Sequence, residues 1–212
     1  TSVIAELLRQ SGRQIAILIH VNPDGDAIGS ALALANLFIR LGHRTAVISP
    51  NDYPVFLKWM PGTENLIVFK KQPEAALDAI KRADLIFALD FNDLKRVKEL
   101  NEAHQASSAY KVLIDHHPDP DVAVDCMISD TSVSSTAELV YRFILDAGMK
   151  EHIDKDVASC IFTGIMTDTG CFSYNSSSRN TWETVAALLD YGIEKDSIYS
   201  LVYDNFSANR MR

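Results

Sequence analysis

Residues 15–30 read Ile-Ala-Ile-Leu-Ile-His-Val-Asn-Pro-Asp-Gly-Asp-Ala-Ile-Gly-Ser. The opening apolar run predicts a buried strand over residues 15–19. Pro23 and Gly25 then bend the backbone. Apolar residues at helical spacing predict a helix over residues 27–41, ended by Gly42. A strand, a tight loop and a helix in this order are the first unit of an α/β fold.

The same alternation continues along the chain on both sides of this unit. Because strands alternate with helices, we expect an α/β fold with a parallel sheet flanked by helices, followed by a mostly helical last third. Ser135 and Glu138 have the spacing of a helix-starting capping box. The predicted strands cover residues 45–49, 66–69, 85–89, 111–114 and 122–128, and the predicted helices cover residues 73–83, 95–106, 136–147, 156–167, 181–191 and 197–203.

The charge balance limits the classes of partner. The 212 residues contain 20 Lys and Arg against 28 Asp and Glu, a net charge of −8. This argues against duplex DNA as a partner, although metal ions could still attract an anionic substrate. Three scattered cysteines and the absence of a signal-like or membrane-spanning apolar run predict a cytoplasmic protein with no membrane partner. A homodimer is left open.

Three apolar strands end on residues that bind metals. His20 follows the first strand, Asp90 follows residues 85–89, and Asp115 follows residues 111–114. The carboxyl ends of parallel strands meet at one edge of a sheet, where α/β proteins bind their ligands. We therefore expect these side chains to lie close together.

Further candidate ligands accompany these strand ends. Asp24 and Asp26 follow His20 within seven positions, His116 and His117 follow Asp115, and Asp168 ends an apolar helical run. Taken singly, Asp26 could be only a helix N-cap, His20 a half-buried structural histidine, and Asp168 part of a helix-ending turn.

Together, the candidate ligands suffice for two metal ions that share Asp90. Mixed imidazole and carboxylate ligands suit Mn²⁺, Zn²⁺ or Fe²⁺ better than Ca²⁺. Two such ions, roughly 3.5–4 Å apart, would hold a phosphoryl group and activate a bridging water. The predicted ligands are His20, Asp24, Asp26, Asp90, His116 and Asp168.

These motifs, in this order, resemble those of the DHH phosphoesterase superfamily, which takes its name from the motif present here at residues 115–117. The motif at residues 20–30, the single Asp90, and Asp168 within Thr-Asp-Thr-Gly match the other family motifs. The resemblance covers most of the chain. It implies a binuclear Mn²⁺ centre in a DHH-type catalytic domain.

The resemblance also implies individual roles for the site residues. His20, Asp24 and Asp90 would hold one ion, and Asp26, Asp90, His116 and Asp168 the other. His117 would contact the scissile phosphate and act in proton transfer, while Asp115 would orient a histidine.

Within the superfamily, the motifs look most like the branch of short-chain oligoribonucleases and pAp phosphatases, often labelled exopolyphosphatase-related. The expected substrates are therefore short RNA and pAp. By the same resemblance, residues 1–205 would form the catalytic domain, and residues 206–212 would begin a linker to a substrate-binding domain.

Other functions are kept as alternatives. An inorganic pyrophosphatase or exopolyphosphatase would use the same ligands, and a metal- or nucleotide-sensing module is the non-enzymatic alternative. Tyr53 and Trp59 are interpreted as packing of a loop on the core, with base stacking as the alternative. The polar residues 176–179 are interpreted as a connection before a helix, with a phosphate-contacting loop as the alternative.

Overall fold

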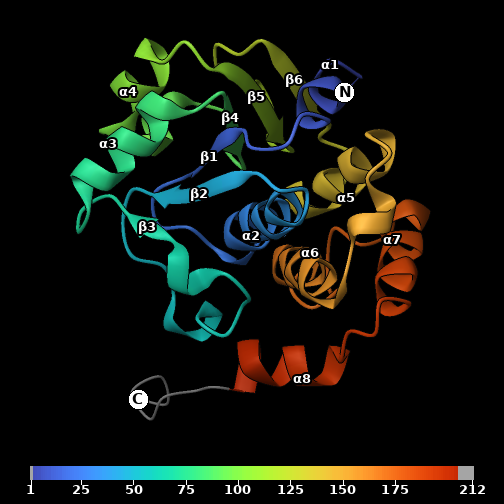
Figure 1. Ribbon diagram of the computed structural model, residues 1–212. Coiled ribbons are helices and arrows are strands. Elements are labelled where there is room, and N and C mark those ends of the chain that lie inside the picture. The colour runs from blue at the N-terminus through green and yellow to red at the C-terminus, as the bar shows by residue number, and fades with distance from the viewer. Residues whose placement is uncertain (1, 205–212) are drawn as a thin grey trace, which may run out of the picture.

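The computed structural model describes residues 2–204, which form a parallel sheet covered by helices on both faces (Figure 1). The α/β fold predicted from the sequence is confirmed. The strands are β1 (Gln14–Ile19), β2 (Arg44–Ser49), β3 (Ile67–Val68), β4 (Leu85–Leu89), β5 (Tyr110–Asp115) and β6 (Cys126–Ser129). The helices are α1 (Ser2–Leu8), α2 (Gly25–Arg40), α3 (Pro73–Arg82), α4 (Leu100–Ala106), α5 (Thr136–Asp146), α6 (Lys155–Asp168), α7 (Arg179–Leu189) and α8 (Lys195–Tyr199).

The apolar strands are buried on both faces because alternate side chains enter two separate cores. Ile15, Ile17 and Ile19 of β1 pack into the core formed with α2, α5 and α6. Ala16 and Leu18 pack into the core on the opposite face, formed with α3 and α4. Figure 1 shows these two groups of helices on opposite sides of the sheet. An unbroken apolar run was therefore the correct signal for these strands.

The order of the strands shows where the direction of winding reverses. The order is β3-β2-β1-β4-β5-β6, and every pairing is parallel. The chain winds outward in one direction from β1 and in the other from β4. Helix α2, which follows β1, lies on one face of the sheet, and α4, which follows β4, lies on the other. In sheets of this kind ligands bind beyond the carboxyl ends of the two strands at this reversal, β1 and β4, which His20 and Asp90 follow.

Several predicted boundaries differ from the structure. The helix predicted over residues 95–106 is a 3₁₀ turn, Leu94–Val97, followed by α4, because the backbone turns left-handed at Lys98 with φ 50°. The strand predicted over residues 122–128 is confined to β6. The last predicted helix is α8 followed by a π turn, Ser200–Asp204.

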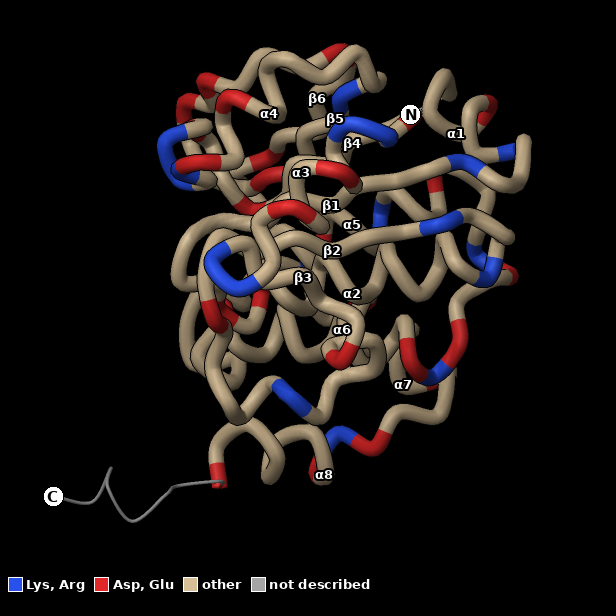
Figure 2. Tube along the Cα trace, turned by 60° about the vertical axis from the view of Figure 1, so that its left-hand side comes forward, with Lys and Arg blue, Asp and Glu red and all other residues tan. Residues whose placement is uncertain are grey.

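Helix α1 was not expected, and its Ile4 and Leu8 are buried. The linker predicted at residues 206–212 lies outside the described residues. In residues 2–204, no helix is both long and apolar enough to cross a membrane. Figure 2 shows acidic and basic residues interspersed along the elements in that view.

Glycine allows α2 and α6 to approach closely. A Cβ atom at Gly29 would lie 2.6 Å from the carbonyl oxygen of Cys160, which is closer than real Cβ atoms come to backbone. A Cβ at Gly164 of α6 would lie 2.9 Å from Oδ1 of Asp26. The glycine of the first motif is thus required by helix packing, which also sets the distance between Asp26 and α6.

We predict that Gly29→Ala destabilises the protein. Alanine normally stabilises a helix relative to glycine, but here the methyl group meets a backbone carbonyl and the two helices must separate. Overpacking of this kind costs about 1–3 kcal/mol. Urea unfolding followed by circular dichroism measures the change.

Ala75→Gly on the exposed face of α3 is the calibrating variant, because it measures the ordinary alanine–glycine difference in this chain. A Gly29→Ala variant as stable as the wild type, or more so, would contradict the packing account.

Candidate metal centre

The loop after β1 is organised by Asp24. Its Oδ1 accepts hydrogen bonds from the backbone N–H groups of Asp26 and Ala27, both at 3.0 Å, so Asp24 is the N-cap of α2. Helix α2 consequently begins at Gly25, two residues before the predicted start. The alternative in which Asp26 is only an N-cap is wrong, because Asp26 lies inside the first turn with its side chain buried.

The carboxylate of Asp26 is held by the N-terminus of a different helix, α5. Its Oδ2 accepts a hydrogen bond from the N–H of Thr136 at 2.7 Å, and its Oδ1 accepts one from the N–H of Ala137 at 2.9 Å. The Thr136 hydroxyl donates to Oδ1 of Asp90 at 2.9 Å. The first turn of a helix has N–H groups without partners inside the helix and a partial positive charge. The start of α5 therefore stabilises two buried carboxylates.

The capping box predicted at the start of α5 is only half formed. Ser135 Oγ accepts from the N–H of Glu138 at 3.2 Å, as expected for the N-cap. Glu138 Oε2, however, accepts from the backbone N–H and the hydroxyl of Ser134 and from the hydroxyl of Thr181. The buried Glu138 thus joins the start of α5 to α7. The spacing in the sequence predicted the cap, but not the contact of α5 with Asp26 and Asp90.

Asp90 lies between two groups of predicted ligands. It follows β4 with φ 64°, a left-handed conformation that aspartate tolerates better than most residues. Its Oδ2 is 3.3 Å from Nε2 of His20, and its Oδ1 is 3.7 Å from Nε2 of His116. The two oxygens of one carboxylate therefore face two different histidines.

Each histidine has its own carboxylates. Nε2 of His20 is also 3.9 Å from Oδ2 of Asp24. Nε2 of His116 is 3.5 Å from Oδ2 of Asp168 and 3.9 Å from Oδ2 of Asp26. All six predicted ligands are thus brought together. They form two groups, His20/Asp24/Asp90 and Asp26/His116/Asp168, in each of which the ligand atoms lie within 4.8 Å of one another.

The crowded carboxylates repel one another. Burial raises the pKa of Asp26 well above its ordinary value, and the charges of Asp90 and Asp168 raise it further. Burial and the charge of Asp24 likewise raise the pKa of Asp90. For Asp168, burial and Asp24 raise the pKa to about 6. A cation between these groups would remove the repulsion, so the cluster has the electrostatics of a metal site.

The orientation of His20 tests whether the residues fit a cation. Its Nδ1 lies 2.8 Å from the carbonyl oxygen of Val21, and a carbonyl can only accept, so Nδ1 carries the proton. In the neutral ring, Nε2 then presents a lone pair to the carboxylate of Asp90. Nε2 is buried and has no hydrogen-bond partner. Burial also lowers the pKa of His20, which favours the neutral ring. A lone pair facing a carboxylate is the arrangement that a metal ion requires.

His117 lies beside the two ligand groups and forms a third group with Asp90 and His116, whose ligand atoms also lie within 4.8 Å of one another. Its Nδ1 lies 2.7 Å from Oδ1 of the fully buried Asp115, and its Nε2 lies 3.3 Å from Nη1 of Arg96. Although His117 Nδ1 is within 3.8 Å of Asp90, the bond to Asp115 already occupies that nitrogen. The hydrogen bond to Asp115 raises the pKa of His117. Arg96 was not predicted as a site residue, because the sequence shows only that it follows the strand ending at Leu89 and not that it contacts His117.

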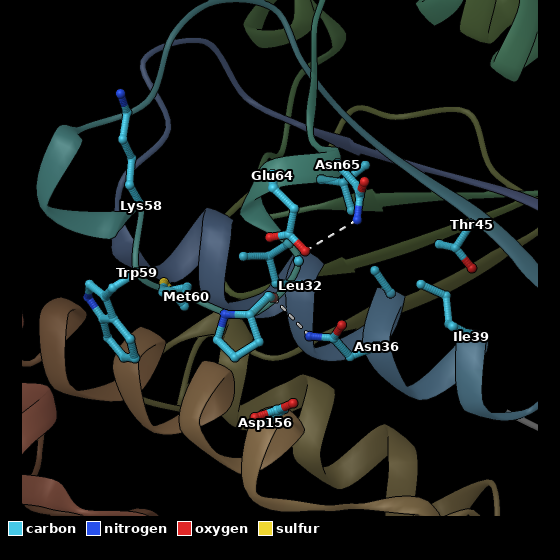
Figure 3. A pocket seen from close by; sticks show the side chains of 14 residues that line it. Leu32, Asn36, Ile39, Thr45, Lys58, Trp59, Met60, Glu64, Asn65 and Asp156 are labelled. Atoms are coloured by element: carbon cyan, nitrogen blue, oxygen red, sulfur yellow. Dashed lines mark hydrogen bonds between the residues drawn. The ribbon is translucent and has the colours of Figure 1, made fainter.

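A hollow of about 320 Å³ lies elsewhere, between α2, the segment before β3, and the start of α6 (Figure 3). Its lining includes Trp59, Asn36 and Asp156 but none of the predicted site residues. Asn36 is ten residues beyond Asp26, about 15 Å along the helix axis. Tyr53 and Trp59 pack against the main core, as the interpretation of loop packing expected.

Of the polar residues 176–179, the first three form the predicted connection before a helix, and Arg179 is already the first residue of that helix. Ser176 donates to the carbonyl of Phe172 at 2.9 Å, and α7 begins at Arg179, two residues before the predicted start.

The chain matches a known protein-family model. Residues 14–165 match the model of the DHH family, N-terminal domain. The chain belongs to the DHH family. The matched residues contain five of the six predicted ligands, and Asp168 follows three residues after them.

Several known proteins are similar to this chain in sequence or structure. A crystal structure of an exopolyphosphatase-related protein from Bacteroides fragilis is 42% identical, with a TM-score of 0.96, over 99% of this chain and 62% of that one. The bifunctional oligoribonuclease and PAP phosphatase NrnA of Thermus thermophilus is 31% identical over 194 residues, 91% of this chain and 54% of that protein.

RecJ of Thermus thermophilus, solved with Mn²⁺, shares the fold at 12% identity, with a TM-score of 0.52 over 95% of this chain and 30% of that one. The chain spans about half the length of the curated relatives it matches.

We predict that Thr136→Val weakens the binding of divalent metal. Valine keeps the shape of threonine but cannot donate to Asp90, and loss of such a supporting hydrogen bond costs about 10- to 100-fold in metal affinity. Titration calorimetry with Mn²⁺ measures the change.

The matched control is Thr163→Val, because the buried Thr163 hydroxyl donates only to the carbonyl of Ser159 in its own helix. Equal Mn²⁺ affinity in the wild type and the Thr136→Val variant would show that α5 does not position the ligands.

Proposed function

We propose that the protein is a phosphoesterase that hydrolyses short oligoribonucleotides and pAp with two divalent metal ions, and that these ions are Mn²⁺. The observation that carries this proposal is the position of Asp90, whose two carboxylate oxygens face two separate ligand groups. A carboxylate shared in this way is typical of enzymes that cleave phosphate esters with two metals.

The ligand groups assign the residues that would hold each ion. His20, Asp24 and Asp90 would hold one, and Asp26, Asp90, His116 and Asp168 the other. The mixture of imidazole and carboxylate suits manganese, which the RecJ protein of the same fold holds. When bound, the two ions would polarise the phosphoryl oxygens and lower the pKa of the attacking water.

The residues beside the ligands would orient the substrate and transfer a proton. Asp115 fixes the ring of His117 by accepting from Nδ1, and Nε2 then accepts from Nη1 of Arg96. The His117 side chain is 32% exposed, so a phosphate ester could reach Nε2. The bond to Asp115 raises the pKa of His117, so Nε2 would take up a proton from the attacking water or solvent and pass it to the leaving oxygen.

The substrate class is supported by the comparisons. The NrnA relative is named for oligoribonuclease and PAP phosphatase activities, and the more similar Bacteroides protein is called exopolyphosphatase-related. Both kinds of substrate carry phosphoryl groups that the proposed centre could bind. Pyrophosphate and polyphosphate are therefore the competing substrates to test.

We expect the full-length protein with Mn²⁺ to hydrolyse pAp and dinucleotides faster than pyrophosphate or polyphosphate, as measured by release of nucleotide or phosphate. Preference for pyrophosphate would refute the substrate class, and no hydrolysis would favour a sensing module.

In the same assay, Asp90→Asn should abolish hydrolysis. Asparagine tolerates the left-handed backbone at this position, whereas alanine would be strained. Asp78→Asn on the exposed face of α3 makes the same chemical change away from the site. Full turnover by the Asp90→Asn variant would refute the two-metal assignment.

A further inference from the structure

Arg96 is a cation beside the ligand cluster and has no acidic partner in the described part of the chain. It lies in the turn Leu94–Val97 after β4, and its Nη1 is 3.3 Å from Nε2 of His117. Among residues 2–204, no carboxylate forms an ion pair with its guanidinium, although Asp90 and Asp115 both lie next to His117. The neighbouring Lys95, by contrast, pairs with Asp93 at 3.4 Å.

The backbone positions Arg96 independently of its side chain. Its carbonyl oxygen accepts a hydrogen bond from the N–H of Val21 at 2.8 Å, which ties the turn to the loop carrying His20. Asp93 closes the other end of the turn by accepting from the N–H of Lys95 at 2.8 Å. These bonds would remain if the side chain at position 96 were changed, so the guanidinium is free to serve another purpose.

The chemistry of the guanidinium indicates what it would bind. Arginine has five N–H donors in a planar fork that matches the oxygens of a phosphate, and one imidazole nitrogen can occupy only one of them. Arg96 is half-buried and His117 is partly exposed, whereas Asp115 is fully buried. Arg96 is therefore within reach of solvent, and its contact with His117 places it beside the proposed metal ligands.

We propose that Arg96 binds a non-bridging oxygen of the substrate's phosphoryl group, so that this domain supplies a phosphate contact of its own. The inference rests on the proposed function, because it takes the substrate to be a phosphate ester held at this cluster. Arg96 and His117 would then contact the same phosphoryl group from adjacent positions. This contact alone would make the protein bind nucleoside monophosphates more tightly than nucleosides, without any contact to the base.

The test measures binding without hydrolysis. Full-length protein saturated with Mn²⁺ is titrated with AMP and, separately, with adenosine, which lacks the phosphoryl group. Arg96→Gln should weaken AMP binding by about 10- to 100-fold, the usual effect of losing a hydrogen bond to a charged group, and leave adenosine binding unchanged. Arg96→Lys should recover part of the affinity, because it restores the charge but not the fork.

Lys95→Gln is the matched control, since that side chain is 88% exposed and is already paired with Asp93. It should bind AMP like the wild type, and Mn²⁺ affinity should be the same in all variants.

The inference is wrong if Arg96→Gln binds AMP as tightly as the wild type, or loses affinity equally for adenosine. It is also wrong if that variant loses Mn²⁺, because Arg96 would then support the ligands instead. These outcomes are separate from failure of the proposed function, which would appear as a wild-type protein that hydrolyses no phosphate ester.

Discussion

Two buried carboxylates close to one another are the central constraint of this structure. Asp26 and Asp90 are almost completely buried, and their mutual repulsion and desolvation would be very unfavourable without compensation. Part of the compensation comes from the first turn of α5, through two N–H groups and one hydroxyl. A bound cation, as proposed above, would supply the remainder. The positions of α2, α5 and β4 relative to one another follow from this requirement.

The packing of the helices serves the same constraint. Gly29 and Gly164 let α2 and α6 approach so closely that a methyl group at either position would collide with a neighbouring helix. This approach places Asp168, at the end of α6, beside His116. Gly29 of the motif at residues 20–30 is therefore needed for the close packing of α2 against α6, in addition to being part of the family motif.

Local patterns in the sequence were sufficient for much of the fold. Buried strands such as β1 and β4 were recognised from apolar runs, because a parallel sheet buries both faces of its strands. The clustering of the candidate ligands at the strand ends could be predicted because the carboxyl ends of parallel strands share one edge. The break at Lys98 was missed, since a left-handed lysine has no signal in the apolar pattern.

Contacts between segments far apart in the sequence could not be predicted. The N–H of Thr136 donates to Asp26 across 110 positions, and Arg96 contacts His117 across 21 positions. No periodic pattern in the sequence indicates either contact. Asp26 was left open as a possible N-cap, whereas Asp24 is the N-cap, because both residues suit the position and only the backbone decides between them.

The most direct test of the two-ion centre is anomalous diffraction from crystals of the protein grown with Mn²⁺, measured at the manganese absorption edge. The account predicts two peaks, roughly 3.5–4 Å apart, on either side of the Asp90 carboxylate. One should lie against His20 and the other against His116. A single peak, or peaks away from Asp90, would contradict it.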